Sequence, residues 1–321
     1  MHIPDGFLDL KTTAVAGALS ATGLAAALRR IRTHPPVRRE PMIGLAAAFI
    51  FVAQMLNFPV LGGTSGHLIG GVLAAVVLGP EVAVVVMSCV LILQCLLFAD
   101  GGLLALGANI WNLAIVAPTL GYAIHALTRR LLPGLRGRLL ATAFAAWCSV
   151  VFASISCAAL LALSGAAPWR ITLPAMVSVH MVIGFGEALI TALVLAAVAR
   201  TRPELLPEGE SERAGADDTR RAIGYGLAVA CGLAAFVAPF ASPLPDGLER
   251  VAERLGFADR AATTPLHNSP FPDYLIPGAN WSALSTVIAG LAGAAVAFAF
   301  AYLLARMLTP RSGSRSARDS V

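Results

Sequence analysis

Apolar stretches of about 20 residues recur along the chain and are separated by short segments that contain glycine, proline or arginine. Each such stretch predicts a helix that crosses a membrane, because a helix satisfies its backbone hydrogen bonds internally when it lies in lipid. The stretch at 67–78 is too short for a full crossing and ends at Gly79-Pro80, and interrupted segments of this kind often line binding sites. We therefore predict an all-α polytopic membrane protein with about nine transmembrane helices. The expected spans are, approximately, residues 12–28, 41–58, 67–78, 82–98, 103–126, 139–163, 171–198, 222–240 and 281–304.

Composition and charge extend this picture to an orientation in the membrane. The chain is 57% hydrophobic and 13% charged, and its mean hydropathy is +0.77. Lys11 is the one lysine, and the other basic residues are arginines that gather after the first, fifth and seventh expected spans. Because cytoplasmic loops carry an excess of basic residues, this pattern places the N-terminus outside the cell and the C-terminus in the cytoplasm. Basic patches are not interleaved with aromatic residues, which argues against binding of nucleic acid.

Polar segments divide the chain into four parts. Residues 201–221 are charged and contain prolines, as is typical of a linker, and the topology makes this linker cytoplasmic. Residues 1–200 form the larger membrane unit in front of the linker. Residues 222–307 form a two-span unit with a long outer loop, and residues 308–321 form a basic cytoplasmic tail.

The first two residues, Met1 and His2, have the chemistry of a metal chelate. The α-amine of Met1, the backbone nitrogen of His2 and the imidazole of His2 can bind one ion and close a five-membered and then a six-membered ring. His67, which the expected topology places on the same outer side, would complete a planar set of four nitrogens. Such a set suits Ni(II), Cu(II) or low-spin Co(II), and it does not suit magnesium or tetrahedral zinc. Because binding releases the amine and amide protons, the affinity should fall as the pH drops.

Several polar residues at membrane depth or in outer loops could support this site, since metal ligands are commonly oriented by further hydrogen bonds. Asn109 shares a helical face with Asn112, and intramembrane amides also commonly join one helix to another. His180 and Glu187 lie on one face of the seventh expected span, so they either pair with each other or support the metal site. The candidates for orienting the loops or the imidazoles are Asp5, Asp100, Asn109, His180 and Glu187.

Together these segments resemble a known family. The resemblance is carried by the opening Met-His-Ile-Pro-Asp-Gly-Phe-Leu, the glycine-rich residues 62–71 around His67, the sequences at 100–102 and 107–109, and residues 180–191. These resemble the CbiM/NikM substrate-binding components of energy-coupling-factor (ECF) transporters for cobalt and nickel. The sequence Pro-Asp-Gly-Leu-Glu at 245–249 resembles the CbiN/NikN partner, often called the PDGLE domain, which is fused here.

The resemblance implies a metal, a ligand set and partners. It implies that Ni(II) or Co(II) is the transported ligand, held by the amine of Met1, the amide nitrogen and imidazole of His2, and the imidazole of His67, without an organic cofactor. It also implies a transmembrane coupling (T) subunit, cytosolic ATPase subunits, and a place in the inner or plasma membrane of a prokaryote. The phosphate-binding pattern GxxxxGK[ST] requires a lysine, and Lys11 has no such context. We therefore expect a transporter subunit without its own ATPase, and not an enzyme.

Small residues at four-residue spacing in the first expected span would let another helix approach closely. That helix belongs either to the coupling subunit or to the same chain. The residues concerned are Ala14, Ala18, Ala21 and Ala25.

Two other functions fit parts of the sequence. The sequence Gly63-Thr64-Ser65-Gly66 fits a GxSG nucleophile pattern, so an intramembrane serine protease with His180 as the base is one alternative. A metal channel that is not coupled to ATP hydrolysis is the other.

Overall fold

The computed structural model describes residues 1–34, 40–202, 216–262 and 268–308. Arg38 and Arg39 of the expected inner loop, most of the predicted linker and nearly all of the predicted tail lie outside these ranges. In chain order the helices are α1 (Leu10–Thr33), α2 (Glu40–Met55), α3 (Gly71–Leu78), α4 (Pro80–Phe98), α5 (Leu106–Asn109), the π-helix η1 (Ile110–Val116), α6 (Ala117–Leu131), α7 (Gly134–Leu163), α8 (Trp169–Thr201), α9 (Ala216–Phe236), α10 (Gly247–Leu255) and α11 (Ser282–Leu308). Three short 3₁₀ turns lie at Ala238–Phe240, Ala258–Arg260 and Pro272–Tyr274.

The prediction of an all-α polytopic membrane protein is confirmed. Six helices in the described part of the chain are long and apolar enough to cross a membrane, and α2 is a shorter apolar helix. The helix α1 is long enough but is less apolar than these, because threonine, serine and glycine are interspersed among its alanines. The helix α3 has 8 residues and ends where Gly79 adopts φ 93°, so it is too short to cross a membrane by itself, as its sequence predicts.

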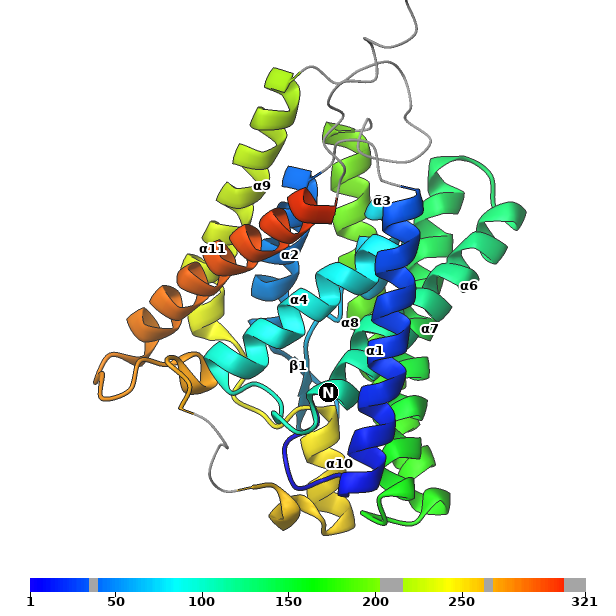
Figure 1. Cartoon of the computed structure of the whole chain (residues 1–321), viewed down its shortest axis with the longest axis vertical. Coiled ribbons are helices and arrows are strands. Elements are labelled where there is room, and N and C mark those ends of the chain that lie inside the picture. Colours follow the sequence, from blue (N-terminus) through cyan, green and yellow to red (C-terminus); the bar gives the residue numbers. More distant parts are fainter. Residues whose placement is uncertain (35–39, 203–215, 263–267, 309–321) are drawn as a thin grey trace, which may run out of the picture.

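The helices pack into one bundle in which the C-terminal helices take part (Figure 1). The long helices α7 and α8 pack along each other, and α6 packs on α7. The helix α11 lies along α2, and α9 contacts both of them. Small and branched side chains on α2, α3 and α4 make up much of the buried core.

A short hairpin of strands β1 (Phe58–Val60) and β2 (Thr64–Gly66) leads to His67. Its turn contains Gly62 and Gly63 at φ 90° and 70°, a backbone region that residues with a Cβ rarely adopt. All three residues of β2 are buried, so the chain is already inside the molecule when it reaches His67.

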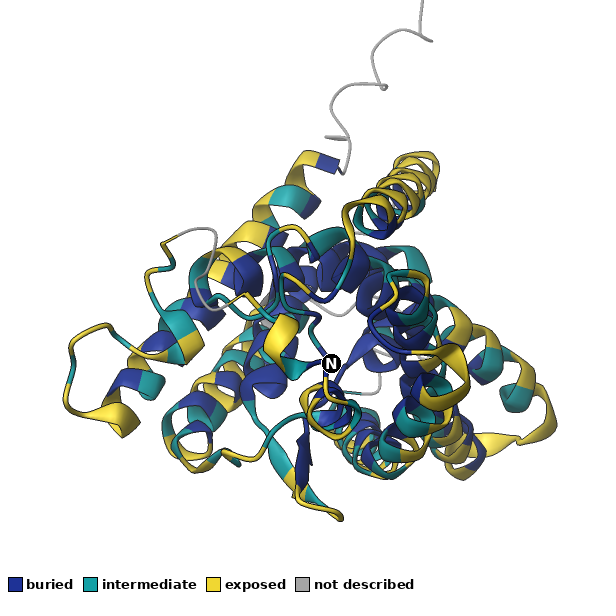
Figure 2. Cartoon of the chain, turned by 90° about the horizontal axis from the view of Figure 1, so that it is seen from below, coloured by how far each residue is buried: buried dark blue, intermediate teal, exposed yellow. Residues whose placement is uncertain are grey.

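The N-terminal segment, residues 1–9, also enters the interior. Figure 2 shows the N-terminus near the middle of the molecule, among buried segments, and Met1 is only 4% exposed. The helix α1 then begins at Leu10, where the side chain of Asp9 caps it by accepting a hydrogen bond from the backbone N–H of Thr12. The first residues of the chain and the segment after β2 therefore meet at one buried place.

Candidate functional site

The amine of Met1 lies between an imidazole and a carboxylate. Its nitrogen is 3.0 Å from Nε2 of His67 and 2.5 Å from Oδ2 of Asp246. Burial disfavours the charged carboxylate of Asp246, but the adjacent ammonium group outweighs burial and holds the pKa of Asp246 well below its usual range. The two residues that the sequence predicts to share an ion, Met1 and His67, are thus in direct contact.

The ring of His67 presents a lone pair to this amine. Its Nδ1 lies 3.1 Å from the carbonyl oxygen of Leu68, so Nδ1 carries the proton and donates it there. Burial, and next the charge of the Met1 amine, lower the pKa of His67 to about 3, so the imidazole is neutral at physiological pH. A neutral imidazole whose Nε2 is unprotonated is the form that binds a metal.

His2 lies beside His67 with the two rings stacked, their centroids 5.3 Å apart and their planes inclined by 12°. Its Nδ1 is 3.1 Å from Oδ1 of Asp100, whereas its Nε2 is buried without a hydrogen-bond partner in the described structure. The other oxygen of Asp100 accepts a hydrogen bond of 2.6 Å from the hydroxyl of Tyr274. Burial opposes ionisation of Asp100, but His2 and this hydroxyl outweigh it and keep the pKa of Asp100 low.

Backbone hydrogen bonds fasten the segment behind His2. The amide of Asn109 pairs with Ile3 in both directions, accepting from its N–H at 2.7 Å and donating to its carbonyl at 3.1 Å. The carboxylate of Asp5 accepts hydrogen bonds from the backbone N–H groups of Leu103, Leu104 and Ala105. Asp5 thus joins the N-terminal segment to residues 103–105, while Asn109 and Asp100 contact Ile3 and His2 of that segment.

His180 and Glu187, by contrast, do not bond to each other. The Nδ1 of His180 donates to the carbonyl of Met176 at 2.7 Å, and Glu187 accepts from the backbone N–H groups of Ile69 and Gly70 at 2.6 and 2.9 Å. The direct pairing considered for these two residues is therefore wrong, because each is hydrogen-bonded to backbone groups instead. Glu187 instead fastens the segment that follows His67.

A small cavity of about 10 Å³ lies between the N-terminal segment and the C-terminal unit. This is about the space of a single water molecule. It is lined by Met1, Gly66, His67, Ile69, Val150, His180, Ile183, Asp246 and Gly247. No group of three or more His, Cys, Asp or Glu side chains that could hold a metal occurs in the described ranges, so an ion at this place would need nitrogen donors from the backbone or the amine.

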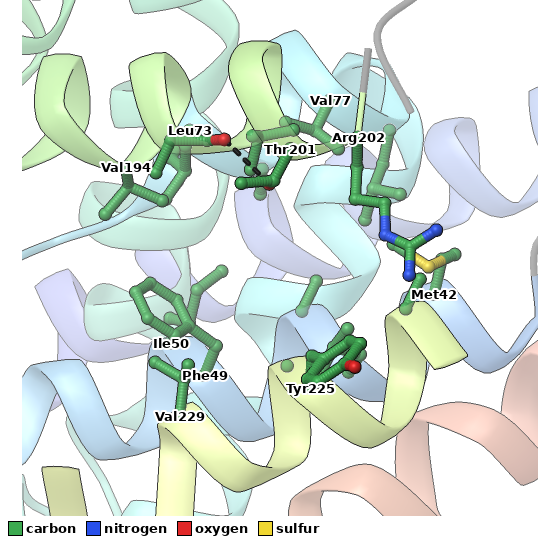
Figure 3. A pocket seen from close by; sticks show the side chains of 18 residues that line it. Met42, Phe49, Ile50, Leu73, Val77, Val194, Thr201, Arg202, Tyr225 and Val229 are labelled. Atoms are coloured by element: carbon green, nitrogen blue, oxygen red, sulfur yellow. Dashed lines mark hydrogen bonds between the residues drawn. The ribbon is translucent and has the colours of Figure 1, made fainter. Parts of the chain in front are cut away.

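A much larger cavity, of about 690 Å³, lies between α2, α3, α8 and α9. Figure 3 shows its apolar side chains, with Arg202 and Tyr225 among them, and the guanidinium carbon of Arg202 lies 6.0 Å from the centre of the Tyr225 ring. Its lining has no set of nitrogen, sulfur or carboxylate ligands, so the larger cavity does not suit a metal ion.

Asp246 and Tyr274 are parts of the site that sequence reasoning missed. Asp246 caps α10, accepting from the backbone N–H groups of Leu248 and Glu249, while Glu249 accepts from the N–H of Asp246. This capping box is readable from Asp-Gly-Leu-Glu in the sequence, and it predicts a helix start. It does not predict that the second carboxylate oxygen reaches the first residue of the chain.

Ser65 does not have the surroundings of a nucleophile. It is fully buried, and its hydroxyl donates to the carbonyl of Leu244 at 2.7 Å instead of to an imidazole. We expect Ser65→Ala to lower the free energy of unfolding by about 1 kcal/mol, the value of one such hydrogen bond, and to leave in place the nickel uptake that the sequence resemblance implies. Thermal unfolding and an uptake assay measure the two effects. Complete loss of the protein's function in a folded Ser65→Ala variant would instead support the alternative of an intramembrane serine protease with Ser65 as its nucleophile.

Comparisons with known proteins agree with this architecture. Residues 2–205 match the family model described as the cobalt uptake substrate-specific transmembrane region, CbiM, and residues 220–310 match the PDGLE domain. A putative fused nickel transport protein NikMN of Archaeoglobus fulgidus is 35% identical, over 95% of this chain and 98% of that protein. The fused nickel transport protein NikMN of Rhodobacter capsulatus is 32% identical, over 98% and 100%.

A solved structure supports the same assignment. The crystal structure of a truncated transition metal transporter matches with a TM-score of 0.57 and 34% identity, over 62% of this chain and 99% of that chain. The resemblance seen in the opening motif, the segment around His67 and the Pro-Asp-Gly-Leu-Glu sequence is thereby confirmed. The chain belongs to the CbiM family of metal transport membrane proteins and carries a PDGLE domain behind its CbiM region.

Proposed function

We propose that this chain is the substrate-capturing membrane component of an ATP-driven ECF importer for nickel or cobalt. It binds the ion through the amine of Met1, the amide nitrogen and imidazole of His2, and the imidazole of His67. The observation that carries the proposal is the 3.0 Å separation between the Met1 nitrogen and Nε2 of His67. Two nitrogens bound at right angles to one ion at about 2 Å each would lie ~2.8 Å apart, so these two atoms already have nearly the spacing of neighbouring ligands.

His2 supplies the remaining donors after a rotation of its ring. The atom that closes a six-membered ring with the backbone nitrogen is Nδ1, which now faces Asp100. A half-turn about the Cβ–Cγ bond exchanges Nδ1 with Cδ2 and brings Nε2 to the side of Asp100. Asp100, held by Tyr274, then accepts a hydrogen bond from Nε2–H, an arrangement that is common for metal-bound imidazoles.

The ion enters from the outer face. The last turns of α1, α6, α8 and α11 carry arginines, and in Figure 1 the C-terminal ends of α1, α8 and α11 lie above the marked N-terminus. Because arginine-rich ends remain in the cytoplasm, the N-terminal site faces the opposite side. The four nitrogens serve Ni(II) and Co(II) alike.

Energy comes from separate ATPase subunits through a coupling subunit. Nickel uptake should therefore require this chain, the coupling subunit and the ATPase subunits together, which a cell lacking other nickel importers can test. Uptake that persists when ATP hydrolysis is abolished in the ATPase subunits would overturn the proposal and favour an uncoupled channel.

The helix α1 provides a contact face for the coupling subunit. Ala14, Ala18, Ala21 and Ala25 are all exposed, whereas α1 packs into its own chain through Thr12, Ala16 and Ser20 among others. We expect Ala18→Leu to weaken co-purification of the coupling subunit while leaving metal binding by the isolated chain unchanged, because the added side chain blocks close helix approach. Assembly and transport at the unmodified level would contradict this role for α1.

A further inference from the structure

The C-terminal unit reaches the amine of Met1 through a short segment, residues 244–247. Four hydrogen bonds fasten this segment to β2. The N–H of Ser65 and the hydroxyl of Thr64 donate to the carbonyl of Pro245 at 2.8 and 2.9 Å. The hydroxyl of Ser65 donates to the carbonyls of Leu244 and Pro245 at 2.7 and 3.4 Å. The residue that follows β2 is His67. The segment is therefore held next to the proposed ligands.

Gly247, at the end of this segment, packs closely against α8. A Cβ at this position would lie under 3 Å from atoms of the His180 ring and of Ile183, so the close approach of α10 to α8 requires glycine here. The start of α10 is thereby pressed against the side of the small cavity. His180, the residue considered as a support for the metal site, forms the surface on which Gly247 rests.

The two oxygens of Asp246 have separate tasks. Oδ1 accepts the backbone N–H groups of Leu248 and Glu249 at 2.7 and 2.9 Å and so caps α10. Oδ2 is thereby directed at the amine of Met1, 2.5 Å away. A carboxylate whose other oxygen is already held by a helix end is a rigid acceptor, because its side chain cannot rotate without losing the cap.

We propose that Asp246 positions the Met1 amine beside His67, so that the C-terminal unit completes the metal site of the CbiM region. The inference rests on the proposed function. An amine bound to a metal keeps two N–H bonds, so it can continue to donate to Asp246 while its lone pair faces the ion. Asp246 thus orients the amine both before and after the ion arrives, in the way that carboxylates orient metal-bound imidazoles.

The chain allows a direct test of amine positioning in the metal-free protein. Its amines are those of Met1 and Lys11, and Lys11 is exposed. Acetylation with an N-hydroxysuccinimide ester, followed by mass spectrometry of the N-terminal peptides, therefore reports the reactivity of Met1 against an internal reference. We expect Met1 to react slowly in the unmodified full-length protein.

Asp246→Asn is the informative variant, because asparagine caps a helix as well as aspartate does but carries no charge for the amine. We expect the Met1-to-Lys11 labelling ratio to rise about tenfold or more, and the affinity for Ni(II) to fall about 10- to 100-fold. The matched control is Glu249→Gln, which removes a neighbouring charge, retains the acceptor of the capping box and touches no atom of the amine. It should leave both quantities unchanged.

The outcomes separate the inference from the proposed function. Unchanged labelling in Asp246→Asn overturns the pairing, and raised labelling with unchanged Ni(II) affinity overturns its role in metal binding. Absence of Ni(II) binding by the unmodified protein overturns the proposed function itself, while the labelling ratio still reports whether Asp246 holds the amine. If Asp246→Asn does not fold, Asp246→Ser, another helix-capping residue without a charge, carries the same expectation.

Discussion

One residue added in front of Met1 is expected to abolish the stoichiometric binding of Ni(II) and Co(II) that requires His67. The addition converts the amine into a peptide nitrogen and places the new amine up to about 3.5 Å further along the chain. The present amine is 3.0 Å from Nε2 of His67, and Met1 is only 4% exposed, so the displaced amine has no room in the same position. Equilibrium dialysis or calorimetry on the purified proteins measures the effect.

The control for this experiment is the same extended protein after a protease has removed the added residue. Restored binding shows that the loss came from the position of the amine and not from misfolding. Equal binding by the extended and unmodified proteins, lost from both on His67→Ala, would refute the amine chelate. A metal site built from His67, His180 and Glu187 would then be the alternative.

Replacing Glu187 with alanine is expected to have the second large effect, on stability and on metal affinity together. The fully buried carboxylate accepts the backbone N–H groups of Ile69 and Gly70, and alanine leaves both groups unpaired. At roughly 1–3 kcal/mol for each of the two unsatisfied groups, the free energy of unfolding should fall by about 2–6 kcal/mol. Because Ile69 lies two residues after His67, the affinity for Ni(II) should fall as well.

Two further variants sharpen this prediction. Glu187→Gln should not restore stability, because its amide oxygen can replace one acceptor while its NH₂ group faces the second N–H. Thr191→Val is the matched control: Thr191 lies one turn along α8, is fully buried, and its hydroxyl has no hydrogen-bond partner in the described structure. Thermal unfolding in detergent should show a large loss for both Glu187 variants and almost none for Thr191→Val, whereas equal losses would contradict the role of the carboxylate.

The membrane class, the positions of most helices and the meeting of Met1 with His67 could be predicted from the sequence. Helix positions follow from the length of apolar runs, which is a local property. The approach of His67 to Met1 was expected because the predicted topology places both residues at the same side of the membrane. Short-range patterns also predicted the break at Gly79-Pro80.

The contacts of Asp246, Tyr274 and Glu187 could not be predicted, because each joins positions more than 100 residues apart. A capping box, or a carboxylate in an apolar stretch, indicates that the side chain needs a hydrogen-bond partner. It does not indicate which distant residue that partner is. The pairing of His180 with Glu187 was considered because they share a helical face. The two side chains do not bond to each other, because Glu187 accepts hydrogen bonds from the backbone N–H groups of Ile69 and Gly70, just before α3.

The hydrogen bonds between β2 and residues 244–245 have a consequence for assembly. When two binding surfaces lie on one chain, each meets the other at an effective concentration in the millimolar range, which does not depend on how much protein the cell makes. A PDGLE unit on a separate chain would have to find its partner by diffusion in the membrane and could be present in the wrong ratio. In this chain each N-terminal amine has one Asp246 available to it, and dilution of the protein does not separate the two groups.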